Sequence, residues 1–202
     1  MLVKKMILWV GLAAAATVGV VAGFAPPPTN RGASKEQLLD ELRASGKTGE
    51  DLANAAIRAV SEAVHHHSVW HLWETPETAV SRGRGWSHQY NTVLARILEA
   101  LGFDVELVHA ARVRGFGYPW YMSGHTWVKV NIAGRRYDAC ASRLTNSLGE
   151  VPFIPVTMEL PLRMQTRIAV PLALSPFVIW HIWKSWILRR PLPEWLFGER
   201  HA

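Results

Sequence analysis

The sequence has one cysteine, Cys140, among 202 residues. A single thiol excludes an internal disulfide and any metal site built from several thiolates. Charged residues are also scarce, at 19%, and lysines and arginines never form a long run. The net charge of +6 is modest and scattered, so the sequence predicts no nucleic-acid partner and favours anionic membrane lipid instead. No pattern predicts a cofactor.

The chain opens with an uncharged, largely apolar run, Met6–Ala25, which follows Lys4 and Lys5 and precedes three prolines. This run is long enough to span a bilayer and longer than a usual signal-peptide core. We expect residues 1–25 to form a transmembrane anchor, with a signal peptide as the alternative, and residues 26–33 to form a linker. Because the lysines precede the run, the main domain should lie on the extracytoplasmic side of the cell membrane.

Residues 34–160 have the pattern of one globular domain, and 49% hydrophobic residues in the chain is ample for its core. Ser34 and Thr48 stand where helix N-caps are expected, ahead of two short helices. Apolar residues recur at spacings of three and four over 87–101, which predicts a buried helix.

Two segments with strand-like alternation follow this helix, at 103–113 and 125–142, and a turn signal at Ala133-Gly134 interrupts the second. Helices that precede a run of antiparallel strands are typical of an α+β fold. We therefore predict helices packed on an antiparallel sheet.

A histidine cluster at His65, His66, His67 and His71 is the one candidate for metal binding. A metal site needs a third or fourth ligand, usually with a carboxylate or thiolate nearby, and none is specified here. We interpret the cluster as a polar helix end and loop, and predict no metal.

The strongest candidate site combines Ser87, at the start of the predicted helix, with His125, at the start of a strand. A nucleophile at a helix N-terminus benefits from the positive end of the helix dipole, and nearby backbone N–H groups can stabilise an oxyanion. A histidine on a neighbouring strand can act as its base.

Four segments carry a resemblance to a known family: GWS at 85–87, LGF at 101–103, GHTWVKV at 124–130 and GRRYD at 134–138. They resemble the transglutaminase-like superfamily, which has a papain-like cysteine-protease fold, and more distantly the arylamine N-acetyltransferases. In that family the residue at position 87 is the catalytic cysteine, His125 matches its histidine, and an aspartate follows on the next strand. Here Ser87 occupies the cysteine position.

The third member of the site depends on the turn between the two strands. A turn centred on Ala133-Gly134 makes Cys140 the diagonal neighbour of His125, and the family's spacing favours this register. A type I turn over 131–134 would make Asp138 the neighbour instead. We favour Asp138, because a carboxylate orients a histidine well, and keep Cys140 as the alternative. Cys140 is also a weaker candidate nucleophile.

The C-terminal segment, 161–202, is hydrophobic, basic and rich in tryptophan. Trp180, Trp183 and Trp186 with flanking basic residues suit an interfacial, membrane-associated helix. The alternatives are a membrane span over 168–188 and a tail that packs back on the domain.

Two functions remain open at this point. The leading hypothesis is a membrane-anchored enzyme that transfers acyl groups or hydrolyses amides through Ser87, His125 and Asp138. The rival is an inactive pseudoenzyme, in which Ser87 caps its helix and the cleft that holds the active site in the family binds a peptide, a cell-envelope fragment or a membrane partner. A further hypothesis is an acyltransferase similar to the arylamine N-acetyltransferases.

Overall fold

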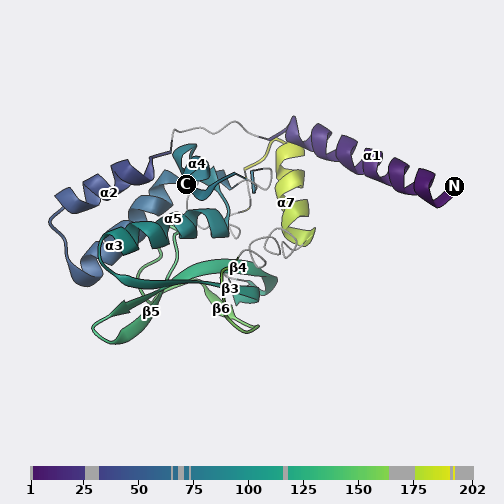
Figure 1. Ribbon diagram of the computed structural model, residues 1–202. Helices are drawn as coiled ribbons and strands as arrows, with labels where there is room; N and C mark the ends of the chain where they lie inside the picture. The colour runs from purple at the N-terminus through teal and green to yellow at the C-terminus, as the bar shows by residue number, and fades with distance from the viewer. Residues whose placement is uncertain are drawn as a thin grey trace.

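The computed structural model describes residues 2–25, 32–64, 66–67, 71–72, 74–115, 118–163, 176–191 and 193. Helices α2, α3, α4 and α5 gather on one side of the main sheet, and α1 projects away from the domain (Figure 1). The fold is therefore α+β, as the order of the sequence patterns predicted. The elements in chain order are α1 (Leu2–Ala22), α2 (Lys35–Ala44), α3 (Gly49–Ala63), β1 (His66–His67), α4 (Pro76–Ser81), β2 (Arg84–Gly85), α5 (Ser87–Ala100), β3 (Asp104–Gly115), β4 (Tyr118–Ile132), β5 (Arg135–Ala139), β6 (Phe153–Pro155), β7 (Leu160–Pro161) and α7 (Pro176–Ile187).

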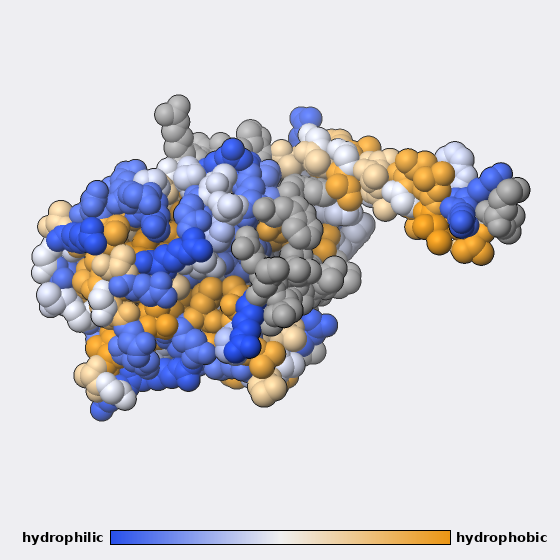
Figure 2. Space-filling view, in the orientation of Figure 1, coloured by the Kyte–Doolittle hydropathy of each residue, from blue (hydrophilic) through white to orange (hydrophobic). Residues whose placement is uncertain are grey.

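Helix α1 is apolar and stands almost entirely in the open. Over Val3–Ala22 its mean hydropathy is 1.9, and the helix is long enough to cross a membrane. Its large side chains are exposed, Trp9 by 68%, whereas Val21 near its C-terminal end is buried. Figure 2 shows this helix as a mainly hydrophobic rod that leaves the domain. A signal sequence near an N-terminus can pass the same test of length and hydropathy, so the helix by itself supports either.

The main sheet is antiparallel, in the order β5-β4-β3-β6, with β7 also paired to β3. The β4–β5 turn consists of Ala133 and Gly134, both with positive φ, at 50° and 77°. Two such residues form the tight hairpin turn whose twist matches the flanking strands. This turn pairs Ile132 with Arg135, so the type I turn over 131–134 that we favoured is wrong.

Helix α5 is the central element between the other helices and the sheet. Its apolar residues recur on one face, which packs against β3 and β4, because burial of that stripe is the main favourable term. The helix ends where the sequence predicted, since Gly102 follows with a φ of 91° that suits a glycine after a C-cap. The fully buried residues of this stripe are Val93, Leu94, Ile97 and Leu98.

Helix α7, from the predicted C-terminal segment, packs against the domain, as in the alternative of a tail that packs back on it. Ile182 and Trp186 are buried in the same core as the rest of the domain, together with Val21 of α1. Trp180, however, is 59% exposed. The three tryptophans that the sequence grouped at one interface are therefore divided between a buried and an open face.

Candidate functional site

The start of α5 is held by Gln89. The Gln89 side chain accepts a hydrogen bond from the backbone N–H of Trp86, the N-cap residue, at 2.9 Å. Its amide also donates to the backbone carbonyls of His71 at 2.7 Å and Glu74 at 3.1 Å. One buried amide thus ties the helix N-terminus to the preceding loop. The sequence reasoning missed this role, although Gln89 stands two residues after Ser87 in the motif.

Ser87 is the first residue inside α5, and its hydroxyl does not cap the helix. The side chain is 2% exposed, and its Oγ makes no hydrogen bond within the described part of the chain. The N-cap role proposed for Ser87 in an inactive protein is therefore wrong, because Trp86 occupies that position. A buried hydroxyl without a partner costs about 1 to 3 kcal/mol. The helix start thus holds a polar group whose hydrogen-bonding capacity is unused.

His125 is buried near the middle of β4 and touches Cys140. The imidazole Nε2 lies 3.3 Å from the Cys140 Sγ, and both residues are at most 5% exposed. The rings of His125 and Phe153 are 4.6 Å apart, and Trp127 stacks on the imidazole at 6.3 Å. Burial, and secondarily the neighbouring His109, lowers the pKa of His125 to about 3. The imidazole is therefore neutral at physiological pH.

Asn91 joins α5 to the end of β5. Its amide Nδ2 donates to the carbonyl of Thr126 at 2.6 Å and to the Cys140 Sγ at 3.4 Å, and its Oδ1 accepts from the backbone N–H of Ala141 at 2.9 Å. Asn91 is fully buried, so these bonds satisfy polar groups that water does not reach. Sequence reasoning missed Asn91, although its spacing of four from Ser87 was a usable signal, because helical residues four apart share one face.

Asp138 lies elsewhere on the hairpin. The register pairs it with Lys129, four residues along β4 from His125, which corresponds to about 13 Å. Its carboxylate accepts hydrogen bonds from the Trp127 indole and from Lys129, each at 2.7 Å. The choice of Asp138 as the neighbour of His125 is thus corrected to Cys140. The physical reason is the two-residue turn, which shifts the partner strand relative to the turn that we favoured.

Ser87 and Asn91 share the α5 face that meets β4 and β5, since they are one turn apart. Ser87 thus lies on the side of α5 that carries the contacts to Thr126 and Cys140. Its hydroxyl makes no hydrogen bond to His125 in this structure. Approach of the hydroxyl to the imidazole stays a prediction.

The histidine cluster is only partly within the described residues. His65 and the side chains of His66 and His67 lie outside them. His71 is half-buried, and burial together with the charge of Arg84 lowers its pKa. Among the residues that the structure describes, no group of three or more His, Cys, Asp or Glu side chains could hold a metal ion.

Three comparisons relate this geometry to known proteins. A family model described as N-acetyltransferase matches residues 71–168, slightly less than half of the chain, and this range includes Ser87, His125, Asp138 and Cys140. No curated protein matches the sequence.

Among solved structures, one similar chain is titled "Crystal structure of a TGase", with 14% identity and a TM-score of 0.43. The match covers 53% of this chain and 30% of that one, so this chain corresponds to under a third of the solved protein. Residues 71–168 are similar to the N-acetyltransferase family. This match confirms the resemblance to the transglutaminase-like superfamily that the sequence motifs indicated.

Proposed function

We propose that this chain is a membrane-anchored pseudoenzyme, a transglutaminase-like domain that binds a peptide or cell-envelope partner without turning it over. The observation that carries the proposal is the identity of the residue beside His125. The family resemblance predicts an aspartate there, and the chain has Cys140. Two of the three site positions that the resemblance implies thus differ from the family, because Ser87 already replaces the cysteine.

Electrostatics support this proposal. A general base works best when its pKa is near the working pH, and that of His125 is about 3. In an active triad, a carboxylate stabilises the imidazolium that forms during attack, and a neutral thiol supplies no such charge. The nearby carboxylate, Asp138, is engaged by Trp127 and Lys129 instead. A serine hydroxyl needs a stronger base than a cysteine does, so Ser87 adds to the deficit.

Burial supports it as well. Ser87, His125 and Cys140 are 2%, 5% and 0% exposed, so a peptide-sized substrate, unlike a small reagent, reaches none of them without a rearrangement of the domain. A scaffold that binds on its surface requires no such opening.

The anchor in this proposal is α1. A bare apolar helix of this length is unfavourable in water and suits the hydrocarbon core of a bilayer. Lys4 and Lys5 at its N-terminal end favour a cytoplasmic position for that end and the outer side for the domain, because positive residues are retained on the cytoplasmic side.

Restoration of the family residues tests the proposal. We expect a fluorophosphonate probe to leave Ser87 of the full chain unlabelled. The Ser87→Cys/Cys140→Asp variant should react with iodoacetamide below pH 7, because the carboxylate would stabilise an imidazolium beside the new thiol. Ser87→Cys alone should react only near the pKa of an ordinary thiol, about 8.5.

Ser61→Cys is the matched control, since Ser61 is a serine of the same burial near the C-terminal end of α3, away from the positive end of a helix dipole. Stoichiometric labelling of wild-type Ser87 by the fluorophosphonate would overturn the pseudoenzyme.

The second candidate is an acyl transferase that uses Ser87, and the unpartnered buried hydroxyl favours it. In that reaction the Ser87 Oγ would attack a carbonyl carbon while His125 takes the hydroxyl proton. The leaving group would depart with that proton, and an amine or water would then release the acyl group from Ser87. The fluorophosphonate experiment separates the two candidates directly.

A further inference from the structure

Helix α7 has two faces of different chemical character. One is buried in the domain core through Ile182 and Trp186, which are 0% and 2% exposed. On the other side, residues at spacings of four and three form a continuous exposed strip along the helix. We call this strip, with the residue that follows it, the outer stripe of α7: Trp180, Lys184, Ile187 and Leu188.

The outer stripe is apolar with a cation in its middle. Trp180, Ile187 and Leu188 are 59%, 44% and 47% exposed. Such large apolar groups are expensive to leave in water when they are contiguous. Tryptophan prefers the headgroup level of a bilayer, and a lysine there can lay its aliphatic stem along apolar surface while its ammonium stays in water.

The charged residues of α7 and of the segment that directly follows it, 176–191, all have one sign. Arg189 and Arg190 follow the helix and are exposed, and residues 176–191 contain no Asp or Glu. Three cations without an acidic residue between them complement an anionic surface, which a protein partner with mixed charges would match less well.

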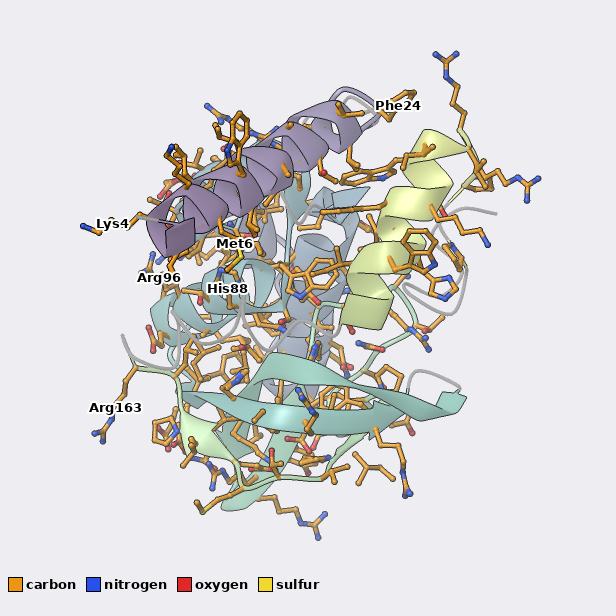
Figure 3. The ribbon with its side chains drawn as sticks, turned by 90° about the vertical axis from the view of Figure 1, so that its right-hand side faces the viewer. Lys4, Met6, Phe24, His88, Arg96 and Arg163 are labelled. Carbon is orange, nitrogen blue, oxygen red and sulfur yellow. The ribbon has the colours of Figure 1, made fainter. Side chains whose placement is uncertain are left out.

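The position of α7 relative to α1 suits the same partner. The two helices are in contact, and Val21 at the domain end of α1 belongs to the same core as Ile182 and Trp186. Figures 1 and 3 show α7 on the side of the domain from which α1 leaves, running across α1 and not alongside it; Phe24 and Lys4 mark the two ends of α1. A helix that crosses the outer end of a membrane-spanning helix lies along the membrane surface.

We propose that the outer stripe of α7 docks on the surface of the bilayer that α1 spans, with anionic lipid headgroups as its ligand. This inference rests on the anchoring role of α1 in the proposed function. The buried face of α7 then joins the anchor to the domain core, and the docked face fixes how the domain is oriented above the lipid.

A pair of labelled variants tests the docking in the full chain. Ile187→Cys places a thiol on the outer stripe, and Ile154→Cys is the control, at an isoleucine of β6 that is 61% exposed. Cys140 is fully buried, so a fluorophore added to the folded chain reacts with the new thiol. The chains are reconstituted in vesicles of phosphatidylcholine with phosphatidylglycerol, and quenched by acrylamide from water or by brominated acyl chains from lipid.

We expect the label at 187 to be quenched by brominated lipid and shielded from acrylamide, and the label at 154 to behave in the opposite way. Arg189→Gln/Arg190→Gln should lower the docked-to-undocked ratio about tenfold or more, since each basic residue near an anionic surface adds to binding. Arg135→Gln/Arg136→Gln, an equal loss of charge on β5, should leave the ratio unchanged.

Equal acrylamide quenching at 187 and 154 in these vesicles would overturn the inference. So would shielding at 187 that requires crowded protein and disappears in dilute vesicles, because that would identify a second copy of the chain as the partner. Alkaline carbonate extraction examines α1 separately. A chain released into the supernatant overturns the anchor and the docking together, whereas a retained chain with an exposed label at 187 overturns the docking alone.

Discussion

Two polar pairs lie on the same β4–β5 hairpin and differ in almost every physical respect. His125 and Cys140 are buried, which favours the uncharged form of each group, and the thiol also accepts from the Asn91 amide. Lys129 and Asp138 are charged and partly open to solvent, with side chains 13% and 29% exposed. The carboxylate thus lies at the solvent-exposed end of the hairpin, and the thiol lies at its buried end, beside the histidine.

The carboxylate of Asp138 acts at a distance from the histidine. Asp138 accepts from the Trp127 indole, and Trp127 stacks on His125, so the acid supports the histidine's neighbour and not the histidine itself. Although burial lowers the pKa of Lys129, its hydrogen bonds to Asp138 and Glu159 raise it above the ordinary value overall. The charged pair therefore has the features of a structural ion pair, whereas the neutral pair is the one that the proposed function interprets as part of a disabled site.

The largest effect is expected from loss of Asn91, which holds the neutral pair in place. Asn91→Ala should destabilise the domain by about 4 kcal/mol, because it leaves the Ala141 N–H and the Thr126 carbonyl without this buried partner and opens a cavity. Thermal unfolding of the full chain in mild detergent measures the change. Asn131→Ala, at an exposed asparagine bonded to Asp104, should change stability by less than about 0.5 kcal/mol. Equal losses in the two variants would contradict this account.

The second-largest effect on stability is expected from acid, through the buried histidine of the neutral pair. His125 titrates near 6.5 when unfolded and at about 3 when folded, so between these values only the unfolded chain takes up the proton. Stability is therefore lost as the pH falls below 6.5. By pH 4.5 the wild type should lose about 3 kcal/mol more than His125→Gln does.

Denaturant unfolding at several pH values measures this difference. The lowered pKa of His109 acts in the same direction in both proteins, so it cancels from the comparison. His181→Gln, at a histidine of α7 outside the site whose pKa burial also lowers, is the control and should keep most of the wild-type loss. Parallel pH profiles for the wild type and His125→Gln would show that the imidazole is not held neutral by burial.

A smaller effect is expected at the charged pair. Asp138→Asn should cost about 1 kcal/mol, because it removes the charge opposite Lys129 while an amide oxygen can still accept from Trp127. In the Ser87→Cys/Cys140→Asp background it should leave the iodoacetamide reactivity unchanged. A large loss of thiol reactivity would mean that Asp138 acts on His125 after all.

The smallest effect on stability is expected at Glu159, which lies beside the charged pair. Glu159→Gln should cost less than about 0.5 kcal/mol, because Lys129 keeps Asp138 as a partner and the Glu159 side chain is 33% exposed. Unfolding of the variant beside Arg58→Gln, which removes an exposed ion pair with Glu62, gives the comparison. A loss larger than that of Asp138→Asn would reverse the ranking of the two carboxylates.

Local patterns in the sequence determined much of this protein. The apolar period over 87–101 predicted α5, Gly102 predicted its end, and Ser34 caps α2 as expected, since its hydroxyl accepts from the Gln37 N–H at 3.1 Å. These features depend on residues a few positions apart, whose geometry a helix sets by itself. The apolar character of α1 was equally plain.

Tertiary contacts set which residue meets His125, what caps α5, and which tryptophans of α7 are buried. Each depends on contacts between segments far apart in the chain, or on a turn in which one residue more or less changes every pairing that follows. Ala133 adopts a positive φ that alanine usually avoids, so the residues alone left the turn centred on Ala133-Gly134 and the type I turn over 131–134 both open. A local pattern specifies an element, whereas the register and packing between elements emerge from the free energy of the whole fold.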